Sequence, residues 1–202
     1  MTIIRRTWPV VLCAAMLTSW TWQGALACAC CSATGERTDL VMPLGASYIQ
    51  DLESLRFDKT AELFLGEADP EMVKGIATPS DKYDLHAAWQ GNRLVLSFRD
   101  KAGKSGTLSL TRPATISIFY VDPRLEPRHH LGAGLYKEWR LKAKAEGSGV
   151  FTPGLGAGQT LTLVLQGRGN NCTSANDFAH WMLVMWGPKA KYHFFGDFVP
   201  TP

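Results

Sequence analysis

Apolar and polar residues alternate with a period of two through much of this chain. Leu94, Leu96 and Phe98, for example, are separated by Val95 and Ser97. The same alternation recurs in the stretches 107–111, 115–120, 140–146 and 160–166. It is typical of antiparallel strands that have one face on a hydrophobic core and the other in water.

The segments between these stretches carry turn residues. Gly91-Asn92 lies between two apolar runs and suits a two-residue hairpin turn. Only two stretches could be helical, namely 46–55 and a single turn near 71–75. We therefore predict an all-β fold with little helix. It is a single-domain antiparallel β-sandwich or small β-barrel of about eight to ten strands.

The first 27 residues have the three zones of a secretory signal. Arg5 and Arg6 precede an apolar run from 8 to 20, and Ala25-Leu26-Ala27 is an A-x-A cleavage site. The run is shorter than the roughly 20 residues of a membrane span, so we expect no transmembrane segment. The predicted organisation is a cleaved signal peptide at 1–27, a Cys-rich N-terminal segment at 28–38 and a β domain at 39–202. The predicted location is the periplasm or the exterior.

An alternative interpretation of the same residues is a lipoprotein. The stretch Ala25-Leu26-Ala27-Cys28 would then direct acylation of Cys28 and anchor the protein in the outer membrane, although leucine is the usual residue at the position of Ala25. Arg5-Arg6 also faintly resembles a twin-arginine export signal.

The charge balance argues against nucleic acid as a partner. Without Arg5 and Arg6 the 21 basic residues become 19, against 18 acidic ones, and the formal charge falls from +3 to +1. Nucleic-acid binding usually needs a concentrated basic face. The expected partner is a small ligand or an envelope protein.

Four thiols remain after removal of the signal: Cys28, Cys30, Cys31 and Cys172. A disulfide between the adjacent Cys30 and Cys31 would be strained. A bridge from one N-terminal cysteine to Cys172 is the first interpretation. In the chain-entropy model it would contribute about 4–5 kcal/mol, because it closes a loop of roughly 140 residues.

A metal site is the second interpretation of these thiols. Cysteine thiolates suit Cu(I) or Zn(II), and His180 and Met182 could complete the ligand set together with Cys172. The spacing is not that of a C-x-x-C zinc knuckle. The sequence leaves disulfide, metal and lipid open as fates of the cysteines.

The stretch 167–177 is a polar segment rich in turn-forming residues. Its candidate ligand-binding side chains are Arg168, Asn170, Asn171, Asn176 and Asp177. The same composition fits a long turn held by side-chain-to-backbone hydrogen bonds. The strand that follows, 180–186, is apolar on both faces, which predicts a strand that is covered on both sides or lines a pocket.

Catalytic motifs are missing from the sequence. It contains no G-x-S-x-G, no H-E-x-x-H and no glycine-rich phosphate loop. We therefore expect an exported periplasmic binding or accessory protein whose N-terminal cysteine cluster is tied to the Cys172 loop. The first alternative is a metal-handling protein that uses the same thiols, and the second is an enzyme without a recognisable motif.

Overall fold

The computed structural model describes residues 35–66, 73–122, 134–169 and 174–200. The strands in these residues are β1 (Arg37–Pro43), β2 (Thr60–Phe64), β3 (Lys82–Gln90), β4 (Arg93–Asp100), β5 (Ser105–Thr111), β6 (Thr115–Val121), β7 (Leu135–Lys144), β8 (Glu146–Gly149), β9 (Thr160–Gly169), β10 (Phe178–Trp186) and β11 (Lys191–Asp197). The helical elements are α1 (Ala46–Ser54) and the short 3-10 turns η2 (Thr152–Gly154) and η3 (Ala175–Asp177). None of the helices in these ranges has the length and apolar content that a membrane span requires.

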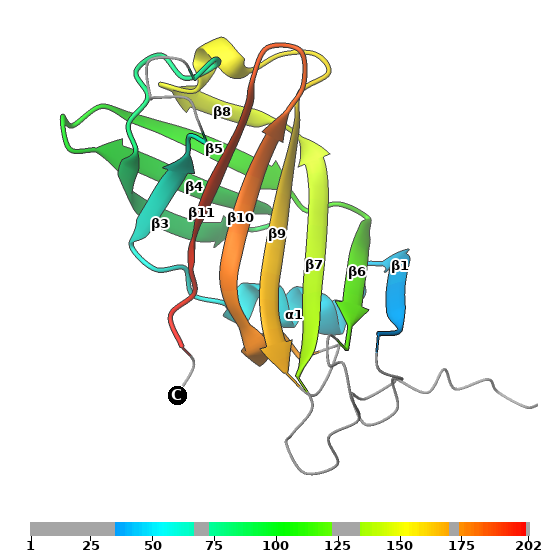
Figure 1. The fold of residues 1–202 in the computed structure, drawn as a ribbon. Coiled ribbons are helices and arrows are strands. Elements are labelled where there is room, and N and C mark those ends of the chain that lie inside the picture. The colour runs from blue at the N-terminus through cyan, green and yellow to red at the C-terminus, as the bar shows by residue number, and fades with distance from the viewer. Residues whose placement is uncertain (1–34, 67–72, 123–133, 170–173, 201–202) are drawn as a thin grey trace, which may run out of the picture.

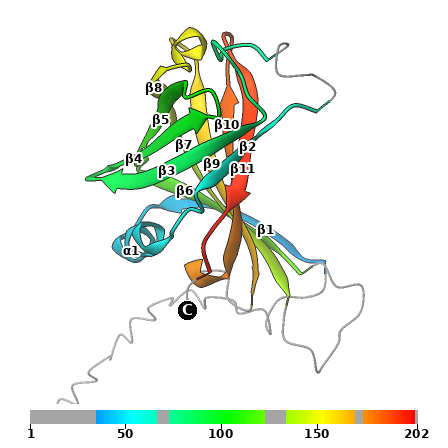
Figure 2. The same cartoon turned by 90° about the vertical axis from the view of Figure 1, so that its left-hand side faces the viewer.

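The described strands form one antiparallel sheet in the order β1-β6-β7-β9-β10-β11-β2-β3-β4-β5-β8, with β1 and β8 as its free edges. The sheet folds over on itself, so that β7, β9, β10 and β11 run in front of β3, β4 and β5 (Figures 1 and 2). β5 also contacts β7 across the fold. The predicted all-β antiparallel fold is confirmed in this sandwich-like, unclosed form, with one strand more than the expected range.

Local sequence signals explain several of these elements. Gln90 pairs with Arg93 at the tight β3–β4 turn, where Gly91 has a φ of 62°, a value that glycine adopts at little cost. The helix expected at 46–55 is present as α1. Its buried residues Tyr48 and Leu52 are four positions apart and so lie on one helix face.

The core lies between the two halves of the folded sheet. Phe194 of β11 is fully buried and lies at the centre of a group of aromatic side chains in this core. Its ring centroid lies 4.7 Å from that of Phe98, 5.4 Å from Tyr83, 5.6 Å from Tyr192 and 5.8 Å from Phe151. Such tilted and edge-to-face pairs add about 0.5–1.5 kcal/mol each beyond the area they bury. The aromatic residues therefore tie β3, β4 and β11 together.

The helix α1 covers one end of this core. Tyr48 packs edge-on against Trp139 of β7, with ring centroids 5.0 Å apart, and the Trp89 Nε1–H of β3 donates a hydrogen bond to the Leu52 carbonyl at 3.2 Å. One helix therefore joins the front and back halves of the sheet.

The strand β10 differs from its sequence prediction. Its inward residues Trp181, Leu183 and Met185 are buried, as a core strand requires. Its outward face is not covered, because His180 and Trp186 are exposed. The sequence pattern records the polarity of the side chains, and it does not record whether another layer covers them.

Candidate functional site

The thiols of the predicted cysteine site, Cys28, Cys30, Cys31 and Cys172, lie outside the described residues, as do Asn170 and Asn171. The described residues that adjoin these cysteines, Gly35 and Gly169, have defined positions in the sheet. The Gly35 N–H donates to the Asp122 carbonyl at 2.8 Å, and Leu135 pairs with Gly169. Because β1, β6, β7 and β9 are consecutive neighbours, both cysteine-bearing segments join the sheet at the same end.

Chain length can be compared with the width of this end. Three strand spacings separate β1 from β9, which is about 14 Å. The five residues from Cys31 to Glu36 span at most about 17 Å, and the three from Gly169 to Cys172 at most about 10 Å. These lengths are sufficient for the predicted bridge between the N-terminal cluster and Cys172.

Asp177, a predicted loop residue, forms a buried ion pair. The Lys137 Nζ lies 2.8 Å from the Asp177 Oδ2, also donates to the Ser174 carbonyl, and sits 5.1 Å from the centre of the Phe178 ring. The Lys137 side chain is 0% exposed, whereas the Asp177 side chain is 28% exposed. The lysine thus fastens the downstream end of the Cys172 loop to the inner face of β7.

Two glycines make room for this contact. A Cβ on Gly167 would lie 1.9 Å from the Asp177 carbonyl oxygen, and one on Gly169 would lie 1.8 Å from its Oδ2. Both distances are far below van der Waals contact. The Gly167-Arg168-Gly169 stretch therefore lets the turn η3 lie directly on β9, which favours a structural interpretation of this motif.

The other predicted site residues do not converge with Asp177. Arg168 and Asn176 are exposed, and the His180 Nδ1 lies 2.6 Å from the Asp197 Oδ1 on the outward face of the sheet. Met182, on the same face, is paired with apolar residues of β9 and β11. Within the described ranges, no group of three or more His, Cys, Asp or Glu side chains is placed to hold a metal ion.

A second polar cluster, centred on Glu138, occupies the outward face of β7. The Glu138 carboxylate accepts hydrogen bonds from Tyr136, Arg140 and Gln166. Burial raises the pKa of Glu138, but the Tyr136 and Arg140 hydrogen bonds and the Arg140 charge outweigh it, so that the pKa is lowered overall. The acceptor atoms of this carboxylate are already used, which indicates a structural role.

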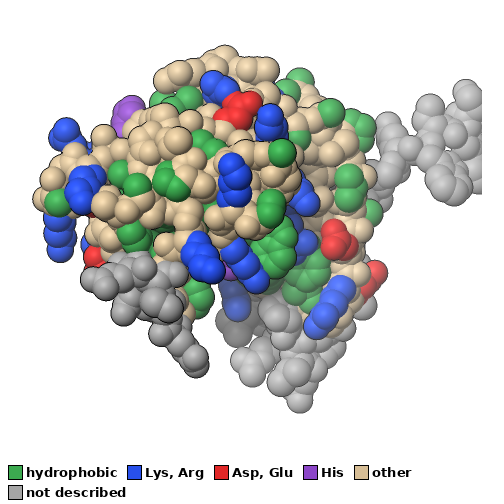
Figure 3. Space-filling model, turned by 90° about the horizontal axis from the view of Figure 1, so that it is seen from above, with side chains coloured by type: hydrophobic (Ala, Val, Ile, Leu, Met, Phe, Trp, Pro, Cys, Tyr) green, Lys and Arg blue, Asp and Glu red, His purple; other side chains and the backbone are tan. Residues whose placement is uncertain are grey.

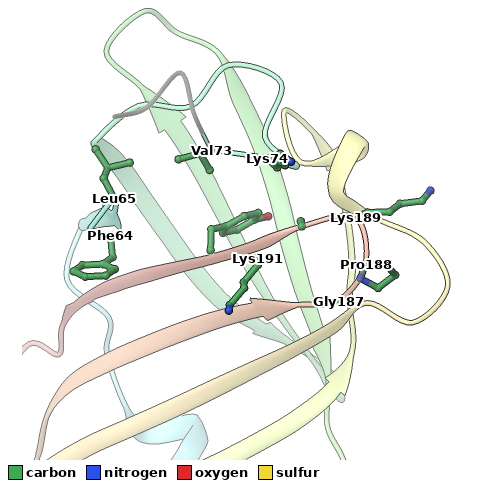
Figure 4. Close-up of a pocket in the computed structure, with 10 residues that line it drawn as sticks. Phe64, Leu65, Val73, Lys74, Gly187, Pro188, Lys189 and Lys191 are labelled. Atoms are coloured by element: carbon green, nitrogen blue, oxygen red, sulfur yellow. The ribbon is translucent and has the colours of Figure 1, made fainter. Parts of the chain in front are cut away.

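The described residues also form a pocket that no pattern in the sequence indicates. It has a volume of about 310 Å³ and lies where β2 leaves β11. β2 pairs with β11 only as far as Phe64 and His193, whereas β11 continues to Lys191 alongside β10. The lining residues come from the end of β2, the segment that follows it and the β10–β11 turn (Figure 4), and they are Phe64, Leu65, Val73, Lys74, Gly187, Pro188, Lys189, Ala190, Lys191 and Tyr192.

The β10–β11 turn that forms one wall is held in place from inside the protein. The buried Gln159 side chain donates to the Ala190 carbonyl at 3.1 Å and accepts from the Lys189 N–H at 2.8 Å. Gly75 packs so closely that a Cβ on it would lie 2.2 Å from the Ala190 Cβ. The pocket wall is therefore a fixed part of the fold.

The pocket combines apolar walls with positive charge. Lys74, Lys189 and Lys191 are exposed, and none forms an ion pair with another described residue. Figure 4 shows Lys189 extending away from the other labelled side chains, and the Lys191 ammonium lies 4.1 Å from the centre of the Trp186 ring. Because Lys191 is stacked on Trp186 and Lys189 extends away, Lys74 is the lysine that we assign to the pocket.

Tyr192 lines the pocket and carries a buried hydroxyl without a hydrogen-bond partner among the described residues. The residue is only 4% exposed. Burial, followed by the neighbouring Tyr83, raises its pKa, so that the hydroxyl keeps its proton. A buried hydroxyl without a partner costs about 1–3 kcal/mol, and this cost falls on a residue that lines the pocket.

Comparison of the chain with protein-family models, with curated proteins and with solved structures found no match.

Proposed function

We propose that this protein is an exported binding protein whose pocket takes a small anion with an apolar body. The observation that carries the proposal is the combination of apolar walls with the unpaired Lys74 and the unpartnered Tyr192 hydroxyl. Binding pockets are mostly apolar and have a few polar groups that orient the ligand. This pocket has that composition.

The size of the pocket limits the ligand. Ligand pockets usually measure about 300–1,000 Å³, so a volume of about 310 Å³ suits a small molecule or a single acyl chain. No acidic residue occurs among the residues described as lining it. The negative group of the ligand would lie toward Lys74, and its apolar part would contact Leu65 and Val73.

Export is the other half of the proposal, and the signal-like residues 1–27 support it. We expect the protein in the periplasm or outside the cell, beginning at Cys28. N-terminal sequencing of the extracytoplasmic protein should give Cys-Ala-Cys-Cys. A diacylglyceryl mass on Cys28 would instead identify an outer-membrane lipoprotein, and an uncleaved chain in the cytoplasm would contradict export.

Calorimetric titration with dodecanoate and with uncharged dodecanol tests the pocket. Dodecanoate should bind more tightly than dodecanol. Lys74→Gln should reduce the ratio of the two affinities about threefold, as expected for the loss of an exposed ion pair. Lys189→Gln is the matched control, because that side chain points away from the pocket (Figure 4). Val73→Trp should fill the pocket and abolish binding.

The proposal fails if the unaltered protein binds neither compound. It also fails if the Val73→Trp variant, with an unchanged circular dichroism spectrum, binds dodecanoate as well as the unaltered chain does.

A metal-handling role for the thiols is the second candidate. The observation in its favour is that the segments carrying Cys28 to Cys31 and Cys172 join the sheet at one end. Competition of the reduced protein with a colorimetric Cu(I) chelator tests this role. Binding that Cys172→Ala abolishes would support a metal site, and equal competition by both proteins would exclude Cys172 as a ligand.

A further inference from the structure

The outward face of the sheet carries two side-chain rows near the pocket. We call these rows the upper outer face. Strand register aligns Lys144, Thr160, Trp186 and Lys191 in one row and Lys142, Thr162, Val184, His193 and Phe64 in the next. All these side chains point away from the core, because residues two apart on a strand share a face.

Several large apolar side chains on and beside this surface are exposed to solvent. Trp186 is 54% exposed and Phe64 is 59% exposed, and Phe195 in the adjoining row is 38% exposed. Half-buried Val184 and Met182 lie between them on β10. Scattered single apolar residues are normal on protein surfaces, but a contiguous group such as this one marks an interaction site.

The same surface is positively charged. Lys142 and Lys144 form no ion pair with a described residue, and neither row contains an acid. Glu62 lies opposite Phe195 in the adjoining row, and Glu138 and Asp197 lie in the row below that. These three acids and Glu146, two residues beyond Lys144, are each paired with a basic residue: Lys82, Arg140, His180 and Arg93 respectively. Viewed from above, Lys and Arg side chains outnumber acidic ones at this end of the molecule (Figure 3).

We propose that the upper outer face docks on an anionic lipid bilayer. Tryptophan and phenylalanine favour the headgroup region, and lysines around them attract anionic headgroups while their stems lie along apolar surface. The Lys191 ammonium, stacked on the Trp186 ring, brings both kinds of group together. A bilayer needs no matching shape, only apolar side chains with cationic groups beside them, and this sheet face offers both.

The proposal is independent of the ligand in the pocket, and its test uses residues that do not line the pocket. The exported chain carrying Cys28→Ser, so that no acyl group on that residue can anchor it, is floated with vesicles of phosphatidylcholine with or without phosphatidylglycerol. We expect binding only to the vesicles that contain phosphatidylglycerol. Trp186→Ser should weaken it about tenfold, and Lys142→Gln with Lys144→Gln about 25-fold.

The matched controls are Val199→Ser, which removes another exposed apolar side chain, and Lys101→Gln with Lys104→Gln, which removes two lysines from the β4–β5 turn. Both should bind as the parent does. The proposal is overturned if the parent does not float, or if the control substitutions weaken binding as much as the test substitutions do. Self-association or binding of a protein that requires Trp186, without vesicle binding, would also overturn it.

Discussion

Replacing Lys137 by methionine tests the buried ion pair that holds the end of the Cys172 loop. Methionine keeps most of the apolar stem and removes the ammonium group. The change leaves the Asp177 carboxylate and the Ser174 carbonyl without that donor. Removing one partner of a fully buried ion pair costs about 3–5 kcal/mol. Because Asp177 is 28% exposed, water can solvate part of its charge, and we expect a loss of about 2–4 kcal/mol.

Urea unfolding followed by tryptophan fluorescence measures this loss. Adding Asp177→Asn to Lys137→Met should recover about 1–3 kcal/mol, because the carboxylate is then no longer left alone. Lys104→Met, in an exposed turn, is the control and should change the free energy of unfolding by less than about 0.5 kcal/mol.

Asp51 supplies a second readout of the same substitution. Burial raises the pKa of Asp51, and the positive charge of Lys137 partly offsets that effect. Lys137→Met should therefore raise the pKa of Asp51 further, as measured by NMR titration. An unchanged free energy of unfolding together with an unchanged Asp51 pKa would refute the view that Lys137 is charged and buried beside these groups.

Three further outcomes follow from the structure. Gly167→Ala should destabilise the fold by a few kcal/mol in thermal unfolding because its Cβ would overlap the Asp177 backbone carbonyl, whereas Gly134→Ala, with open space around it, should have little effect. Glu138→Gln should lower stability at neutral pH by about 1–3 kcal/mol. The depressed pKa of Glu138 gives stability that is present above its ordinary value near 4.5 and lost as the pH falls through the lowered value, so the variant should show a weaker acid dependence. Cys172→Ala should expose the N-terminal segment to protease and lower stability by a few kcal/mol in oxidising buffer only; intact masses that show no disulfide in the parent would contradict this.

The regular parts of the fold could be predicted because they depend on neighbouring residues. The alternation of Leu94, Leu96 and Phe98 identified β4, and Gly91-Asn92 identified its hairpin with β3. The order of the strands depends on contacts between distant residues. Nothing in the sequence near β2 indicates that it pairs with β11, about 130 positions later.

The pocket could not be predicted for the same reason. Leu65, Val73 and Lys191 line one pocket only because β2 stops pairing at His193, two residues short of the Lys191 end of β11. The polar composition of 167–177 could be recognised in the sequence. The burial of Lys137 against Asp177 could not, because in the sequence Lys137 is one of several charged residues in the same strand.

The pocket and the cysteine-bearing segments belong to opposite ends of the long strands. The β10–β11 turn lies at the upper end of the sheet in Figure 1, and the end of β9 and the start of β1 lie at the lower end. The ten residues of β9 span about 33 Å between these ends. A small ligand bound beside Lys74 would therefore be too far from Gly169 to share a metal with the loop that follows it. Ligand binding and thiol chemistry are consequently separate hypotheses, and Val73→Trp and Cys172→Ala should each remove one activity and leave the other intact.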